Sequence, residues 1–228
     1  MNLWGKVTSG YFEKSRTMPV INLFDINESR VGIWHITEPA NQLLSQLEPG
    51  KGELDLYREF SNDRRKRQWL GYHLLLKYML SPLAADLIYD IYGKPFLKSG
   101  SHHISVSHAG DYAAAICNRH FSVGVDIEKI SERIQRVKDR FLNNAELEQL
   151  GTCAGSGILH VYWCGKEALY KLNGEPDVDF KNDIHINAFD YLCDTNGTCS
   201  AKLTKASGSK KFTLHYRKLD DYMLVVAG

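Results

Sequence analysis

The chain has 228 residues, 43% of them hydrophobic and 24% charged, and its formal net charge of +1 argues against wholesale coating of nucleic acid. No apolar run approaches the ~20 residues of a membrane span, and the first residues lack the apolar core of a secretory signal, so neither insertion nor secretion is expected. Five cysteines without C-x-x-C spacing favour reduced thiols in a cytoplasmic protein.

The first half of the chain mixes helical and strand patterns. The stretch up to about Ser29 has no clear period and receives no assignment. The longest helical pattern runs from residue 56 to about residue 80 and ends at Ser81-Pro82; its apolar second half predicts a buried helix. The other elements expected here are a strand at 31–36, a helix at 39–47, a strand at 87–92 and a hairpin of 103–108 with 112–117.

The second half also combines helices with strands. The expected elements are a strand at 123–128, helices at 130–140, 144–150 and 157–172, and strands at 183–187, 198–203, 211–216 and 222–227. Helices beside meander-like strands predict an α+β fold, and the length allows two domains. We expect one α/β half at residues 1–119 and a second at 120–228, each with helices packed on a small, mostly antiparallel sheet.

Two carboxylates stand out on the strand at 123–128. Asp126 and Glu128 are two residues apart, so both side chains lie on one face of the strand. Carboxylates this close repel each other unless a cation lies between them. The alternative is an exposed strand face with two solvated acids, but strands disfavour Asp and the neighbouring residues are apolar. The pattern therefore favours a functional pair.

The helix at 157–172 contributes a third carboxylate. Glu167 and Lys171 are four residues apart and share a helix face, and Lys166 precedes Glu167 directly. By itself this could be an ordinary surface ion pair. Together with the strand acids, a carboxylate flanked by lysines is what a magnesium-bound phosphate ester requires, because oxygen ligands hold the metal and ammonium groups offset the remaining phosphate charge.

Three further groups could bind an anion. Ser107 and His108 are adjacent on a strand, so they cannot readily pair as nucleophile and base, but a hydroxyl and a cationic imidazole can bind phosphate; a cap and a turn residue are the alternative. The basic run at 64–67 could be a solvated helix face, a nuclear-import tract or a nucleic-acid patch. Within it, Arg67 lies close to Trp69 and is expected to face inward toward an anion. Lys94 occupies a loop, and composition alone gives it no role.

Together these segments resemble the 4′-phosphopantetheinyl transferases of the surfactin-synthetase-activating (Sfp) type. The similarity covers roughly residues 60–175 and is most specific in its last two motifs. The matching segments, in the order of the family, are Arg67-Gln68-Trp69-Leu70-Gly71, Tyr92-Gly93-Lys94-Pro95, Ile104-Ser105-Val106-Ser107-His108, Gly124-Val125-Asp126-Ile127-Glu128 and Trp163-x-x-Lys166-Glu167-Ala168-x-x-Lys171.

The resemblance implies a fold of two pseudo-symmetric halves and an enzyme that moves the phosphopantetheine arm of coenzyme A to a serine of an acyl or peptidyl carrier protein, releasing adenosine 3′,5′-bisphosphate. The second half would supply the acids and the phosphate-binding lysines, and the first would supply coenzyme A contacts. The implied ligands of Mg²⁺ or Mn²⁺ are Asp126, Glu128 and Glu167. The implied catalytic residues are Glu167 as base and Lys171 at the leaving group. The implied contacts of coenzyme A are Arg67, Lys94, Ser107, His108, Lys166 and Lys171.

The resemblance also implies a carrier protein as partner, docked on roughly residues 130–147. Carrier proteins are acidic, and the basic side chains of this segment suit electrostatic steering. They are Arg133, Arg136, Lys138 and Arg140. We expect a monomer without nucleic-acid or membrane partners.

Three other functions remain open from the sequence. A non-catalytic module could hold coenzyme A or a nucleotide bisphosphate, although pure binding does not need three carboxylates. A metal-dependent phosphohydrolase would also use acids and lysines, and would release phosphate without a carrier. Nucleic-acid binding through residues 64–67 is the remaining alternative, but nothing else basic or aromatic accompanies that run.

Overall fold

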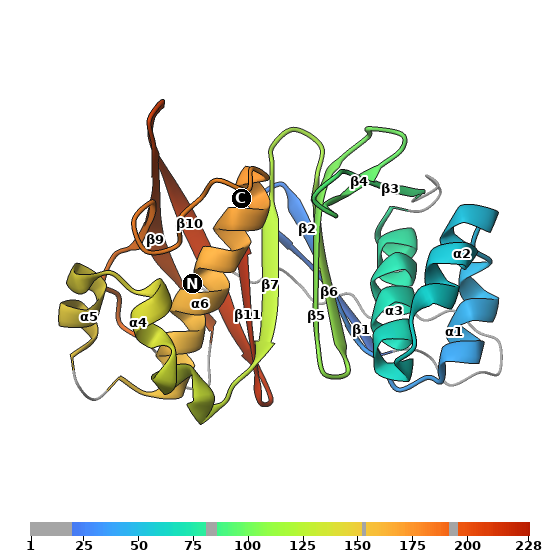
Figure 1. Ribbon diagram of the computed structural model, residues 1–228, viewed down its shortest axis with the longest axis horizontal. Coiled ribbons are helices and arrows are strands. Elements are labelled where there is room, and N and C mark those ends of the chain that lie inside the picture. The colour runs from blue at the N-terminus through green and yellow to red at the C-terminus, as the bar shows by residue number, and fades with distance from the viewer. Residues whose placement is uncertain (1–19, 81–85, 152–153, 192–195) are drawn as a thin grey trace. The chain divides into compact units, whose positions relative to one another are not determined.

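The computed structural model describes residues 20–80, 86–151, 154–191 and 196–228, which form two compact units (Figure 1). Unit 1 contains the described residues up to Tyr89 together with Pro95–Arg119, and unit 2 contains Asp90–Lys94 and the described part of His120–Gly228. Each unit combines helices with an antiparallel sheet, which confirms the predicted α+β class.

Unit 1 is built on a four-stranded antiparallel sheet. Its strands, in spatial order, are β1 (Val20–Ile26), β2 (Ser29–His35), β6 (Tyr112–Asn118) and β5 (His103–Ala109). Its helices are α1 (Ala40–Leu47), α2 (Lys51–Glu59) and α3 (Asp63–Met79). Helix α3 packs against β2, β6 and α1, so its apolar half is buried as predicted (Figure 1). A two-stranded hairpin, β3 (Leu87–Tyr89) with β4 (Pro95–Leu97), completes the unit.

Two predictions for unit 1 are wrong. The single helix expected from residue 56 to residue 80 is interrupted, because Asn62 starts a new helix: its side chain accepts hydrogen bonds from the backbone N–H groups of Arg64 and Arg65 at 2.8 and 3.3 Å. The expected strand at 87–92 ends at residue 89. There, the Asp90 carboxylate accepts the backbone N–H groups of Tyr92 and Lys94, which closes a turn.

Unit 2 has a five-stranded antiparallel sheet. Its strands, in spatial order, are β7 (Gly124–Lys129), β11 (Tyr222–Ala227), β10 (Gly208–Leu219), β9 (Asn196–Lys205) and β8 (Ile184–Ile186). Its helical elements are the 3₁₀ helix η1 (Glu132–Arg136), α4 (Lys138–Phe141), α5 (Asn144–Leu150) and α6 (Ser156–Asn173). The helix expected at 130–140 is therefore two short elements. Helix α6 crosses β7 and β11, and the core of the unit lies between them (Figure 1).

Gly124 allows β7 to lie directly against α6. A Cβ atom at this position would be 1.8 Å from the carbonyl oxygen of Ala168 and 3.1 Å from Cβ of Leu172. Because the nearer atom is backbone, the strand would have to move away from the helix.

We therefore expect Gly124→Ala to lower the free energy of unfolding by about 3 kcal/mol, measured by urea denaturation. Gly52→Ala is the matched control, since a Cβ there meets nothing within 4 Å and Gly52 lies inside helix α2. This control should be neutral or stabilising by up to ~1 kcal/mol. Equal effects of the two substitutions would contradict the close approach of β7 and α6.

Two further observations bear on the sequence analysis. No helix within the described ranges is long and apolar enough to cross a membrane. Cys117, Cys164 and Cys199 are buried free thiols, whereas Cys153 and Cys193 lie outside the described residues.

Candidate active site

Strand β7 directs two carboxylates toward helix α6. Asp126 pairs with Val225 of β11 and Glu128 pairs with Met223, and these two partners belong to the core that α6 covers. Asp126 is 3% exposed, and its Oδ1 accepts a hydrogen bond from Nζ of Lys171 at 2.6 Å. The alternation of the strand thus produces the shared face that the sequence predicts.

Helix α6 provides the third carboxylate. Trp163, Glu167 and Lys171 follow one another at intervals of four residues, so they lie along one stripe of the helix. Burial and the negative charge of Asp126 raise the pKa of Glu167, while Lys171 opposes this rise. Burial and the charge of Asp126 likewise raise the pKa of Glu128 to about 7, with Glu167 adding to the rise and Lys171 opposing it. The three carboxylates therefore lie within electrostatic reach of one another.

A hard divalent cation fits the chemistry of this cluster. Carboxylate oxygens are preferred ligands of Mg²⁺. Burial first, and then the charge of Asp126, raises the pKa values of Glu128 and Glu167, and a bound cation would offset both effects. In the described part of the chain, however, no three His, Cys, Asp or Glu side chains are arranged as a metal-holding group. The ammonium group of Lys171 is the counterion of Asp126 in this state.

The structure contradicts the predicted phosphate contact of Lys166. This side chain is 0% exposed, and Nζ donates to four acceptors. They are the carbonyl oxygens of Phe141, Phe180 and Ile184 at 2.8, 2.7 and 2.8 Å, and Oε2 of Glu146 at 2.7 Å. An ammonium group has three protons, so none is left for a ligand. Burial lowers the pKa of Lys166, and the charge of Glu146 opposes this. Lys166 is a core residue of unit 2.

Lys94 lies at the C-terminal end of α6. Its Nζ donates to the carbonyl oxygen of Lys171 at 2.8 Å, in the last turn of the helix, where lysine side chains commonly bind backbone carbonyl groups. Burial lowers the pKa of Lys94. The loop lysine is thus placed beside the backbone of a predicted catalytic residue, and its contact with coenzyme A stays a prediction.

In unit 1, a second basic residue accompanies His108. The guanidinium of Arg65 hydrogen-bonds Nε2 of His108, and the ring of Tyr72 stacks over the same imidazole with 6.3 Å between centroids. Sequence reasoning missed Arg65, although the signal was present: residues 65 and 72 are two helical turns apart and share one face of α3.

The other two predicted residues of unit 1 differ in their surroundings. Arg67 faces anionic groups, as expected, but these are the carboxylates of Asp63 at 3.2 Å and Asp111 at 3.4 Å. Ser107 is 8% exposed and, as the strand neighbour of His108, points to the opposite face of β5. Contacts of Arg67, Ser107 and His108 with coenzyme A stay predictions.

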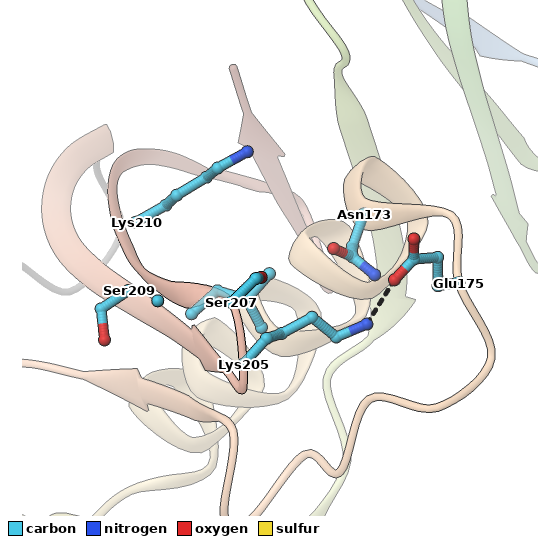
Figure 2. A pocket seen from close by; sticks show the side chains of 8 residues that line it. Asn173, Glu175, Lys205, Ser207, Ser209 and Lys210 are labelled. Atoms are coloured by element: carbon cyan, nitrogen blue, oxygen red, sulfur yellow. Dashed lines mark hydrogen bonds and ion pairs between the residues drawn. The ribbon is translucent and has the colours of Figure 1, made fainter.

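A cavity of about 250 Å³ lies between the end of α6 and the β9–β10 turn (Figure 2). Among its lining residues, Lys205 pairs through Nζ with Glu175 at 2.5 Å, and the same Nζ also pairs with Asp177 at 2.7 Å. None of its lining residues is a predicted site residue. The cavity therefore shares no residue with the carboxylate cluster.

A comparison with protein families bears on the segment that contains this cluster. Residues 122–227 match the 4′-phosphopantetheinyl transferase superfamily. The matched segment contains Asp126, Glu128, Glu167 and Lys171, and it supports the general family that the sequence resembles. The match covers a little under half of the chain and supports a transferase. No curated protein matches the chain.

Proposed function

We propose that this chain is a transferase of the surfactin-synthetase-activating type, which moves the 4′-phosphopantetheine arm of coenzyme A to a serine of an apo carrier protein and depends on Mg²⁺. One observation carries the proposal: Asp126, Glu128 and Glu167 form one electrostatic cluster with Lys171, inside the segment that matches the superfamily. Neither a simple binding module nor a nucleic-acid-binding protein needs three carboxylates within electrostatic reach of one another.

The residues of the cluster would divide the work between them. Glu167 would accept the proton of the carrier serine, and its raised pKa makes it a stronger base. The serine oxygen then forms a bond to the phosphorus that bears pantetheine, and the bond from this phosphorus to the bridging oxygen breaks. Lys171 would stabilise the negative charge on the departing adenosine 3′,5′-bisphosphate. Asp126, Glu128 and Glu167 would hold Mg²⁺, which supplies charge neutralisation at the pyrophosphate.

Coenzyme A contacts from unit 1 belong to the same proposal. His108 and Arg65 form a basic pair suited to a phosphate group, and the ring of Tyr72 fixes the imidazole from one side. We assign the 3′-phosphate to this pair, with Arg67 and Ser107 as further candidate ligands of coenzyme A.

The carrier protein would dock on η1 and α4. Arg133, Arg136 and Arg140 are exposed on these elements, and the apolar side chain of Val137, 36% exposed, lies among them. An acidic partner would be steered by the three charges.

Reversing two of these charges should raise the KM for the carrier protein. We expect Arg136→Glu with Arg140→Glu to raise it about 10-fold or more at low salt, since exposed charges mainly set association rates. The KM for coenzyme A and kcat should stay unchanged. Lys210→Glu in the exposed part of β10 is the control. An unchanged carrier KM in the double variant would count against this docking surface.

Intact-mass spectrometry tests the function itself. A panel of apo carrier proteins from fatty-acid, polyketide and nonribosomal-peptide synthesis is incubated with coenzyme A, with Mg²⁺ or with EDTA. We expect at least one carrier to gain the mass of one phosphopantetheine arm only with Mg²⁺. Release of phosphate or phosphopantetheine without a carrier would favour a phosphohydrolase, and coenzyme A binding without either product would favour a binding module.

A further inference from the structure

The turn between β3 and β4 presents Lys94 to helix α6. Oδ1 of Asp90 accepts the backbone N–H groups of Tyr92 and Lys94, both at 2.9 Å, and the backbone N–H of Asp90 donates to the carbonyl oxygen of Lys94 at 3.1 Å. An aspartate that binds the backbone in this way fixes a tight turn. Residues 90–94 belong to unit 2, which also contains α6 and the three acids. The position of Lys94 is therefore set by a hydrogen-bonded turn.

The side chain of Lys94 lies across the end of α6. The helix ends at Asn173, and Gly174 follows with a φ of 76°, its N–H bound to the carbonyl oxygen of Tyr170 at 3.0 Å. A Cβ atom at Gly174 would be 2.5 Å from Nζ of Lys94 and 3.6 Å from its Cδ and Cε. The glycine thus leaves the space that the Lys94 side chain occupies. From there, Nζ donates to the carbonyl oxygen of Lys171 at 2.8 Å.

Lys171 is held at both ends by these contacts. Its carbonyl oxygen accepts the bond from Lys94, and its Nζ donates to Oδ1 of Asp126 at 2.6 Å and to the carbonyl oxygen of Val125 at 3.2 Å. Lys171 lies in the last turn of α6, and helix ends fray. A cation beside the C-terminal carbonyl groups also suits the helix dipole. Loss of the Lys94 contact would therefore loosen the backbone from which Lys171 reaches β7.

We propose that Lys94 is a positioning residue, which holds the last turn of α6 so that Lys171 keeps its place beside Asp126. The resemblance implies instead that Lys94 contacts coenzyme A. The inference rests on the proposed function in that it takes Lys171 as the group that stabilises the leaving group. A displacement of about 1 Å in such a group can cost about 100-fold in rate. A lost positioning contact should lower kcat, whereas a lost contact with the substrate should raise the KM for coenzyme A.

Lys94→Met removes the ammonium group and keeps a long, unbranched side chain. We expect kcat for transfer to fall about 10- to 100-fold, with the KM for coenzyme A within about twofold of the wild type. In a Lys171→Met background, the same substitution should change kcat by less than about twofold, because Lys94 acts through Lys171. Lys94→Arg, which restores a donor, should recover part of kcat. Hydrogen exchange at residues 167–174, followed by mass spectrometry, should be faster in Lys94→Met.

Lys77→Met is the matched control. Nζ of Lys77 donates to the carbonyl oxygen of Leu47, the last residue of α1, at 3.1 Å, so it makes the same kind of contact in unit 1. This variant should leave kcat within about twofold of the wild type, because its helix carries no predicted catalytic residue. An equal fall of kcat in Lys77→Met and Lys94→Met would show a general effect on stability and would overturn the inference.

Three further results would overturn it. They are a raised KM for coenzyme A with unchanged kcat in Lys94→Met, a full additional loss of kcat in the Lys171→Met background, and unchanged hydrogen exchange at residues 167–174. A wild type that modifies no carrier protein overturns the proposed function. The exchange measurement then decides by itself whether Lys94 holds the last turn of α6, since it needs neither coenzyme A nor a carrier protein.

Discussion

Glu167→Gln should lower kcat for phosphopantetheine transfer by about 10²- to 10⁴-fold, the usual contribution of a positioned general base. The substitution keeps the size of the side chain and removes its charge, so it should leave the fold intact. Stopped time courses of carrier mass provide the rate, and the thermal unfolding midpoint checks the fold. In the unmodified protein, burial raises the pKa of the Glu167 carboxyl group and so strengthens it as a base. The amide of the variant cannot accept the proton of the serine.

Glu175→Gln is the control for this experiment. Glu175 is an acid of the same unit and also pairs with a lysine, Lys205, but at the separate cavity near the β9–β10 turn. Its loss should leave kcat within about twofold of the wild type, because exposed ion pairs contribute little. If Glu167→Gln also retained near-normal turnover, the base would have to be another group and the mechanism would be wrong.

Lys166→Met should lower the free energy of unfolding by about 3–5 kcal/mol, because it leaves the carboxylate of Glu146 buried without its counterion. Both side chains are 0% exposed, so water cannot replace the lost partner. Urea denaturation measures the loss. The carbonyl groups that Lys166 binds would lose their donor at the same time, which places this value at the upper end for single substitutions.

Two comparisons separate the buried pair from a general charge effect. Lys205→Met removes a lysine from an exposed ion pair and should change stability little. The double variant Lys166→Met with Glu146→Leu removes both charges and should recover part of the loss, since an apolar pair leaves no buried charge behind. A single variant as stable as the wild type would show that Lys166 reaches solvent, and would reopen its predicted phosphate contact.

Local patterns were sufficient for the three acids and Lys171 and insufficient for Lys166. Strand alternation placed Asp126 and Glu128 on one face, and helical spacing placed Glu167 with Lys171, because both rules depend only on near neighbours in the chain. The direction of Lys166 depends on where residues 141 and 180 fold, and no local pattern contains that information. Successive residues of a helix point about 100° apart, so the position of Lys166 next to Glu167 in the sequence does not predict the surroundings of the Lys166 side chain.

Other features that the sequence analysis missed are nevertheless signalled in the sequence. Asn62 is a favourable N-cap residue inside the pattern at 56–80, and it marks the point where α2 and α3 separate. Arg65 lies two turns before Tyr72, on the face of α3 that meets His108. By contrast, β1 became a strand by pairing along its full length with β2, a tertiary contact that overrides its mixed polarity.

Equilibrium binding of Mn²⁺ in the presence of coenzyme A tests the central claim most directly, namely that acids of β7 and α6 share one divalent cation. Electron paramagnetic resonance would count the bound ions in the wild type and in Asp126→Asn, with Glu175→Gln as control. The account predicts one bound Mn²⁺ per chain in the wild type and the control, and binding at least 10-fold weaker in Asp126→Asn. Unchanged Mn²⁺ affinity in Asp126→Asn would contradict it.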